Sequence, residues 1–259
     1  MMQTSAFQAR RNVIADRFAR GTVVAASALA LEFEVSEDAI RRDLRALAND
    51  GLCRRVHGGA HPVYPQTHPM AQRIGDARRW KEALARVAAE TIRPGELVFI
   101  DSGSTNLALT EFIPLETGIK VATNSIDIAS AVLRRPDLRL IMIGGAVDST
   151  VGGTVDAAAT HAVVGLDFER CFLGACAISL DEGVGAAIAR DATFKRALKE
   201  ASRQITVLAL NEKFSASVIH RVCNLSDVNL LVVESDAEAR FLGPIQEAGV
   251  PVLRAAAVV

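Results

Sequence analysis

A series of short apolar runs after residue 95 constrains the fold of this chain more than any other feature. Seven such runs occur, and helical stretches separate most of them. Strands that are apolar throughout are typical of a sheet covered on both faces, because neither face meets water. Their alternation with helices predicts an α/β domain with a mainly parallel sheet. The runs cover residues 97–100, 119–122, 138–143, 171–173, 205–210, 228–233 and 250–253.

The first 51 residues have a different pattern, which predicts three helices. Residues 7–20 and 27–33 are expected to form the first two. Ser36 is a favourable N-cap for the third, because its hydroxyl can accept a backbone N–H of the first turn. Two acidic residues follow Ser36 and suit the positive end of the helix dipole. Apolar residues then recur at i, i+4 and i+7 and predict one buried stripe, formed by Ile40, Leu44 and Leu47.

Helix, short helix, tight turn and capped third helix are the order of a helix-turn-helix. The third helix of this motif enters the major groove of DNA. Arginine on its outer face is suited to bidentate contact with guanine. Residues 52–63 predict a hairpin, whose basic side chains would contact phosphates or the minor groove as a wing. The alternative is a solvated charged face on an ordinary helical bundle. The expected DNA-binding residues are Ser36, Asp38, Arg41, Arg42, Arg45, Arg54, Arg55 and His57.

The distribution of charge favours two domains with different partners. The formal net charge of the 259 residues is only −1. Residues 1–80, however, carry 12 basic and 8 acidic side chains, whereas the remainder carries 17 and 22. We call residues 1–80 the head and the remainder the body. The head has a basic excess that suits nucleic acid, although the chain as a whole is nearly neutral. The proline-rich stretch 61–76 reads as a linker with little structure of its own, so we expect a winged helix-turn-helix domain at 1–60 and an α/β effector-binding domain at 77–259.

Other features limit the compartment and the cofactors. No apolar run approaches the roughly 18–20 residues that span a bilayer, and the first 20 residues show no secretory pattern. The four cysteines form no CxxC pair and have no histidine at zinc-finger spacing. We therefore expect a cytoplasmic protein with reduced thiols, no membrane contact, no metal and no cofactor.

Small or polar residues follow three consecutive predicted strands. In open α/β sheets, ligands bind beyond the carboxyl ends of the strands. The first of these segments also precedes a predicted helix, and backbone N–H groups at a helix start can bind an anion together with hydroxyl groups. Glycine allows the backbone to approach the ligand closely. The sequence therefore predicts an anion site made of residues 101–105, 123–125 and 144–145.

Both parts of the chain resemble the DeoR family of bacterial transcriptional regulators. The resemblance of the head is in SEDAIRRDLRAL at residues 36–47, Gly51 and RVHGGA at 55–60. Ala39 departs from it, since the family commonly has threonine there, whose hydroxyl would supply one phosphate contact. The body is similar to the family's carboxyl-terminal sensor domain, which looks like sugar-phosphate isomerases. Its matching pieces are DSGST at 101–105, TNS at 123–125, Gly144-Gly145, FLG at 172–174, Gly183 and FKR at 194–196.

The resemblance implies a phosphorylated sugar or a related metabolite as the effector. Residues 102–105 would hold its phosphate, while Asp101, Asn124 and Lys195 would meet its hydroxyls or carbonyl end. The family commonly has aspartate at the position of Asn211, and an asparagine cannot act as a carboxylate, which changes the expected ligand set. The expected effector-binding residues are Asp101, Ser102, Gly103, Ser104, Thr105, Thr123, Asn124, Ser125, Gly144, Gly145, Lys195, Asn211 and Lys213.

The function that the sequence favours is a DNA-binding regulator, a repressor of a sugar or carbohydrate operon, acting as a homodimer or homotetramer on double-stranded operator DNA. One alternative is a sugar-phosphate isomerase or deaminase with an appended helical domain. Such an enzyme needs a positioned general base, and the sequence has no paired carboxylate signature, metal cluster or nucleophile elbow, so no catalytic residue is expected. The other alternative is an accessory module whose body only oligomerises.

Overall fold

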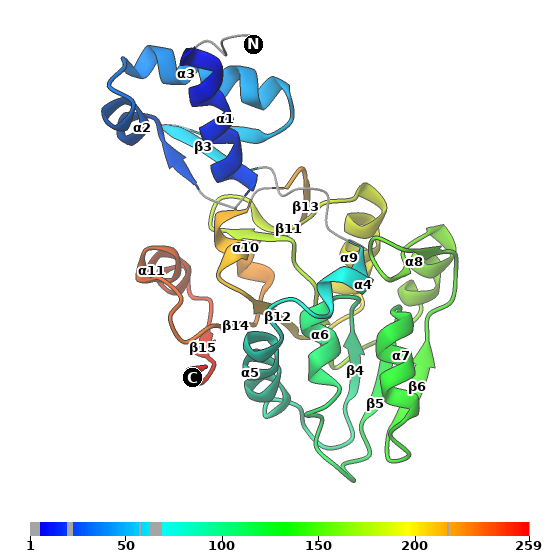
Figure 1. The fold of residues 1–259 in the computed structure, drawn as a ribbon. Coiled ribbons are helices and arrows are strands. Elements are labelled where there is room, and N and C mark those ends of the chain that lie inside the picture. The colour runs from blue at the N-terminus through cyan, green and yellow to red at the C-terminus, as the bar shows by residue number, and fades with distance from the viewer. Residues whose placement is uncertain (1–5, 20–22, 57, 63–68, 217, 259) are drawn as a thin grey trace. The chain divides into compact units, whose positions relative to one another are not determined.

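The computed structural model describes residues 6–19, 23–56, 58–62, 69–216 and 218–258 (Figure 1). The chain forms two compact units. The first holds the described residues up to 62 together with 215, 216 and 218, and the second holds the rest.

The first unit is a three-helix bundle completed by a small antiparallel sheet. Three helices and a hairpin agree with the prediction, and a third strand of two residues is added to the hairpin. The close approach of this added strand explains Gly59, since a Cβ on Gly59 would lie 2.1 Å from the carbonyl oxygen of Val24. The elements are α1 (Ala6–Ala19), β1 (Val24–Ala25), α2 (Ala26–Glu32), α3 (Glu37–Asn49), β2 (Cys53–Val56) and β3 (Gly59–Pro62), with sheet order β1-β3-β2.

Helix α3 forms where the capping and the apolar stripe predict it. The hydroxyl of Ser36 accepts a hydrogen bond from the backbone N–H of Ala39 at 3.3 Å. Ile40, Leu44 and Leu47 are buried against α1 and α2. The capped end and the single buried face leave the opposite face of α3 exposed.

The second unit is built on a seven-stranded parallel sheet. All six neighbouring pairs of strands are parallel, and every predicted apolar run contributes a strand. The order β15-β14-β12-β9-β4-β5-β6 places the first and fourth strands side by side at the centre, where the chain changes direction across the sheet. The strands are β4 (Leu97–Ile100), β5 (Lys120–Thr123), β6 (Arg139–Met142), β9 (Arg170–Leu173), β12 (Ile205–Ala209), β14 (Leu230–Val233) and β15 (Val252–Arg254).

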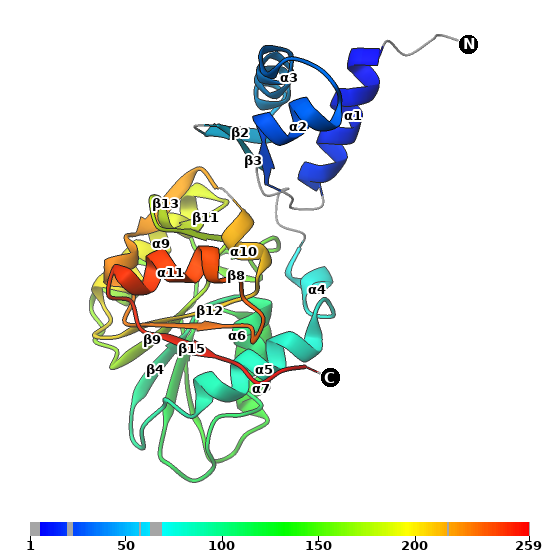
Figure 2. The same cartoon turned by 90° about the vertical axis from the view of Figure 1, so that its left-hand side faces the viewer.

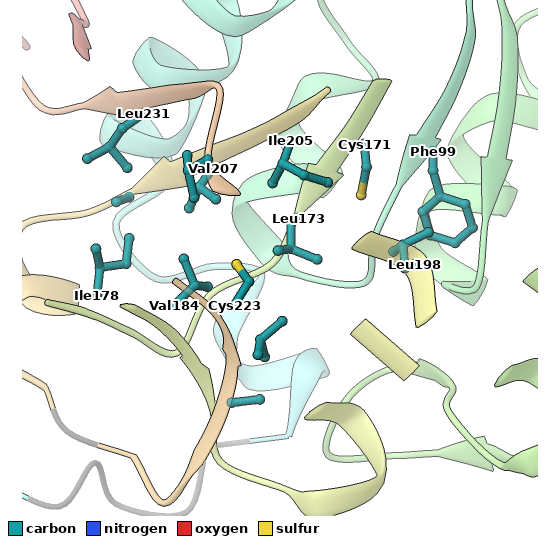
Figure 3. Close-up of a cluster of buried hydrophobic side chains, with 14 of the residues drawn as sticks. Phe99, Cys171, Leu173, Ile178, Val184, Leu198, Ile205, Val207, Cys223 and Leu231 are labelled. Carbon is teal, nitrogen blue, oxygen red and sulfur yellow. The ribbon is translucent and has the colours of Figure 1, made fainter. Parts of the chain in front are cut away.

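Helices cover both faces of this sheet, as the apolar strands predict (Figures 1 and 2). One apolar cluster joins the sheet to α5 (Arg78–Ala89), α6 (Ser104–Leu109) and α7 (Ile126–Leu133). The other joins it to α8 (Ala157–Val164), α9 (Ala189–Glu200) and α11 (Ala239–Glu247). Figure 3 shows part of this second cluster, including Phe99, Cys171 and Leu173.

The coverage is incomplete at the edge strand β6. Ile141 is 38% exposed and Met142 is 40% exposed, although the run 138–143 predicts a strand covered on both faces. Edge strands have a neighbour on one side only, so their side chains are covered less well. The expectation of full burial is therefore wrong for this strand.

Short elements complete the second unit. Strands β10 (Ala177–Ser179), β11 (Gly183–Ala186) and β13 (His220–Cys223) form an antiparallel sheet, whose β11 and β13 contact α9. The remaining elements are α4 (Met70–Arg73), the ribbon of β7 (Val147–Asp148) and β8 (Gly153–Thr154), α10 (Glu212–Ser215) and the 3-10 helix η1 (Leu225–Asp227). In the described part of the chain, no helix is long and apolar enough to cross a membrane.

The segment 61–76 contains regular structure on both sides of residues 63–68, which lie outside the described residues. His61 and Pro62 belong to β3 and pair with β2. Met70–Arg73 form α4, in which Met70 is buried and lies against Gly152. The guanidinium of Arg73 donates to the carbonyl oxygen of Thr150 at 3.0 Å. Part of this proline-rich stretch is therefore packed on the body.

Candidate functional site

A group of buried charged side chains lies at the centre of the large sheet, where β4 and β9 are neighbours. The ammonium of Lys195 on α9 donates to Oδ2 of Asp101 at 2.7 Å and to Oδ1 of Asp191 at 2.8 Å. The backbone N–H of Gly174 also donates to Oδ2 of Asp101, at 2.8 Å. The three charged side chains are at most 7% exposed. Ligands of open α/β sheets bind at such a change of direction, beyond the carboxyl ends of the strands.

The charges of Lys195, Asp101 and Asp191 shift the pKa values of Lys195 and Asp101. Burial raises the pKa of Asp101, the positive charge of Lys195 opposes that rise, and the negative charge of Asp191 adds to it. Burial alone would lower the pKa of Lys195, but the two carboxyl groups outweigh burial and raise it. Lys195 is therefore a cation held between two acids, and its charge is already matched inside the protein.

Asn124 connects the carboxyl ends of three strands. Its side-chain oxygen accepts from the backbone N–H of Ser102 at 3.0 Å, and its Nδ2 donates to the carbonyl oxygen of Thr154 at 3.0 Å. Gly153 is required beside it, since a Cβ there would lie 2.6 Å from the carbonyl oxygen of Asn124 and 3.2 Å from Cβ of Ser102. Asn124 is fully buried, so its amide fixes the loop that follows β4.

Two polar atoms of this site are buried without a hydrogen-bond partner among the described residues. They are Oδ1 of Asp101 and Oγ of Ser102. A buried polar group without a partner costs free energy of about 1–3 kcal/mol. The two atoms belong to adjacent residues at the end of β4. A ligand that donates to the carboxylate and pairs with the hydroxyl would remove both costs.

The residues after Ser102 start a short helix. Gly103 is the N-cap of the six-residue helix α6, in which Ser104 is buried and Thr105 is half-buried. Asn106, which sequence reasoning missed, donates to the carbonyl oxygens of Asp101 at 3.0 Å and Phe172 at 2.9 Å. It ties the end of β4 to β9 and thereby holds the backbone on which Asp101 and Ser102 lie.

The exposed face of the first unit carries the basic residues expected there. Arg41, Arg42 and Arg45 of α3 are exposed, as are Arg54 and Arg55 of β2. Ser36 and Asp38 are exposed at the start of α3. His57 lies outside the described residues.

The arginine of this face nearest the start of α3 is held by acids of the first turn. Arg41 donates to Oε2 of Glu37 at 2.7 Å and to Oδ1 of Asp38 at 3.0 Å. Nε of Arg42 donates to the backbone oxygen of Asp38 at 3.3 Å.

A buried carboxylate fixes α3 against α1. Asp43 is 2% exposed and forms ion pairs with Arg10 at 2.6 Å and with Arg11 at 2.8 Å. Sequence reasoning missed this contact, because the partners of Asp43 are 33 and 32 residues away. The contact sets the orientation of α3 on the bundle.

Family models match both units of this chain. Residues 10–66 match the DeoR-like helix-turn-helix domain, and residues 77–235 match the DeoR C terminal sensor domain. This chain belongs to the DeoR family.

Individual DeoR-family relatives are similar over nearly their whole length. The "Putative aga operon transcriptional repressor" of Escherichia coli O157:H7 is 27% identical over 94% of this chain and 92% of its own length. The glycerol-3-phosphate regulon repressor of Escherichia coli K12 is 28% identical over 87% of this chain and 90% of its own. The structure of ribose 5-phosphate isomerase A from Methanocaldococcus jannaschii is 12% identical, with a TM-score of 0.38, over 52% of this chain and 53% of that one.

The other residues expected at the DeoR effector site have different surroundings. The hydroxyl of Thr123 donates to the carbonyl oxygen of Ile100 at 2.6 Å and accepts from the N–H of Ser125. The hydroxyl of Ser125 caps α7. Gly144 and Gly145 are exposed, and a Cβ on Gly145 would lie 2.4 Å from Oδ1 of Asp156. These hydroxyls and glycines thus have structural contacts of their own.

Asn211 lies in a second polar group, at the ends of β12 and β14. Its backbone N–H donates to Oε1 of Glu234 at 2.6 Å, and its Nδ2 donates to Oδ1 of Asp236 at 2.9 Å. Burial raises the pKa of Glu234, which the hydrogen bond from Asn211 partly offsets. Lys213 pairs with Glu212 at 3.0 Å. Asn211 therefore contacts the carboxyl groups of both Glu234 and Asp236.

Asp191 belongs to the central site and was not predicted, although its spacing to Lys195 could have indicated it. Asp191 lies four residues before Lys195, the spacing at which opposite charges pair along a helix. Glu234 had no such signal, because only the pairing of β12 with β14 brings it to Asn211. Among the described residues, histidine, cysteine and acidic side chains form no group of three or more suited to a metal ion.

Proposed function

We propose that this protein is a repressor of a sugar-metabolism operon, which binds operator DNA through α3 and binds a phosphorylated sugar in its sensor domain. Membership of the DeoR family and the repressor functions of its relatives support the first part. The second part rests on two buried atoms at the centre of the sensor sheet, Oδ1 of Asp101 and Oγ of Ser102, which have no hydrogen-bond partner among the described residues.

The charges suggest which end of the ligand lies where. Lys195 already pairs with two carboxyl groups, so it has little positive charge left for a phosphate. The free Oδ1 of Asp101 is an acceptor and suits a sugar hydroxyl. The hydroxyl of Ser102, with Ser104 and Thr105 behind Gly103, is a donor that suits the phosphate. A ligand with a phosphate and a neighbouring hydroxyl therefore fits both atoms.

The ligand proposal is tested by a thermal-shift screen of phosphorylated sugars and inorganic phosphate. A ligand that binds the native state raises the melting temperature. Ser102→Ala should leave the melting temperature without ligand unchanged or slightly higher, because it removes an unpaired buried hydroxyl, but it should abolish most of the ligand-induced shift.

The matched control is Thr206→Val in β12. Thr206 is also fully buried, and its hydroxyl has no hydrogen-bond partner in the part of the chain that the structure describes. Its replacement therefore removes the same kind of cost and should leave the ligand-induced shift intact. Absence of any shift with the wild-type chain, or an equal shift in Ser102→Ala, would contradict a phosphorylated sugar at this site.

DNA binding is tested by gel shift with the full chain on duplexes enriched from a random library. We expect a homodimer whose two α3 helices contact half-sites about 34 Å apart, or a multiple of that distance. Arg41→Ala should weaken binding to the enriched duplex by about 1–3 kcal/mol if Arg41 contacts guanine bidentately. Arg203→Ala removes an exposed charge from the body and serves as the control. Failure to enrich any sequence would overturn the proposal.

The two activities must be coupled for regulation. An effector changes DNA binding only if its affinity differs between the DNA-competent and the DNA-incompetent state. The same gel shift, repeated with the sugar that raises the melting temperature, measures this difference directly.

A further inference from the structure

Arg41 is paired with two acidic side chains in the unbound protein. One terminal nitrogen of its guanidinium lies 2.7 Å from Oε2 of Glu37, and the other lies 3.0 Å from Oδ1 of Asp38. All three side chains are exposed: Arg41 at 54%, Glu37 at 45% and Asp38 at 79%. The local charge of the three groups is negative, although they lie on the face of α3 that carries the basic residues.

These contacts make a DNA phosphate a less favourable partner for Arg41 than a guanine base. A DNA phosphate that takes Arg41 away from Glu37 exchanges one anion for another and brings a negative charge close to the released carboxylate. A guanine edge offers two neutral acceptors, which engage the planar fork of the guanidinium without adding a negative charge. Glu37 therefore disfavours a phosphate contact more than it disfavours a guanine contact.

We propose that Glu37 is a specificity-determining residue, which competes with DNA phosphates for Arg41 and thereby suppresses binding to unrelated sequences. The inference rests on the proposed DNA-binding function. Asp38 takes part in the same contact, but Glu37 makes the shorter one, and its i,i+4 spacing to Arg41 is favourable on a helix.

A purely structural role for Glu37 makes a different prediction. An acid in the first turn stabilises a helix through the helix dipole, and its loss would then lower the stability of the first unit without changing the choice among DNA sequences. The two roles are separated by measuring thermal stability and sequence preference on the same variants.

The experiment compares affinities for an enriched duplex and for a scrambled duplex of the same composition, with the full chain. The variants are Glu37→Gln, Arg41→Ala and the double variant. Asp50→Asn is the matched control, because it removes the same charge from the far end of α3. Asp50 is exposed and lies nine residues beyond Arg41, about 13 Å along a helix axis.

We expect Glu37→Gln to lower the ratio of specific to scrambled affinity roughly two- to fivefold, the range that one exposed ion pair supports, mainly by tighter binding to scrambled DNA. Asp50→Asn should leave the ratio unchanged. In the Arg41→Ala background, Glu37→Gln should have no further effect on the ratio of specific to scrambled affinity.

Two results would overturn the inference. One is an equal change of the ratio in Glu37→Gln and Asp50→Asn, which would indicate a general charge effect. The other is an undiminished change of the ratio when Glu37→Gln is made in the Arg41→Ala background, which would mean that Glu37 acts independently of Arg41. If the wild-type chain enriches no duplex at all, the proposed function itself fails, and this result is distinct from both.

Discussion

The ammonium of Lys195 lies 2.7 Å from a carboxylate oxygen of Asp101, although 94 positions separate the two residues. This contact links the loop after β4 to α9, and Asp191 on α9 completes it. An ion pair buried so deeply is sensitive to the loss of one partner, because the remaining charges have no water to solvate them.

Lys195→Ala should lower the free energy of unfolding of the sensor domain by about 3–5 kcal/mol, since it leaves two buried carboxyl groups without their cation. Urea denaturation of the full chain measures the loss. Lys199→Ala on the same helix is the control, because Lys199 is 28% exposed and an exposed pair contributes about 1 kcal/mol or less. Equal losses in both variants would contradict the stabilising role of the buried group.

Asp43→Ala should destabilise the DNA-binding domain by about 2 kcal/mol. The value is below the usual cost of breaking a buried pair, because Arg10 and Arg11 remain 15% and 29% exposed to water. The same variant should also weaken DNA binding, since α3 loses its attachment to α1. Asp50→Ala, on the exposed end of α3, is the comparison; a loss no larger than that of Asp50→Ala would show that the buried contact contributes nothing.

The contribution of Asp137 to stability should disappear in acid. Hydrogen bonds from the Arg135 guanidinium lower the pKa of Asp137 from 3.8 to about 2. A carboxyl group whose pKa is lowered on folding stabilises the native state above its unfolded pKa and loses that effect as the pH falls through the folded one. The melting temperatures of the wild type and Asp137→Asn should therefore differ at pH 7 and converge between about pH 4 and pH 2. A constant difference over this range would contradict the pairing.

Cys176 should be the thiol that reacts in the folded protein. Burial raises the pKa of Cys53 to about 11 and that of Cys223 to about 12, and it raises the pKa of Cys171 as well. Thiolates are the reactive form, so Ellman's reagent at pH 8 should modify one thiol quickly in the native chain and all four in urea. Cys176→Ser should abolish the rapid reaction; rapid reaction of a second thiol would show that a buried cysteine is accessible.

Local patterns were sufficient to predict the three helices of the first unit and the strands of the large sheet, but not which elements lie side by side. The capped third helix and the apolar runs were recognisable, because capping and burial act over a few residues. The two-residue strand β1 had no such signal, since Val24 pairs with Ala60 from far along the chain. The order of the seven strands is likewise a property of packing, and it alone brings Gly174 to Asp101.

Only part of the candidate site was predicted, because local patterns do not show which distant residues come into contact. Asp101 and Ser102 were expected from the polar segment that follows the first strand, whereas Lys195 was expected only from the resemblance. The fold brings Lys195 to Asp101. The supporting residue Asn106 was missed, because an asparagine inside a short helix has no distinguishing pattern until its contact with Phe172 is known.

The central place of β9 beside β4 has a consequence for the order in which the chain acquires structure during synthesis. Val98 pairs with Arg170, so the middle of the sheet cannot form until the ribosome has passed that point. The strands and helices of the first unit, apart from residues near 215, lie within the first 62 residues, and domains made first fold first. Pairing between distant segments is also slow. A nascent or prematurely ended chain therefore carries a folded DNA-binding head before it has the two strands that hold Asp101 and Gly174 together.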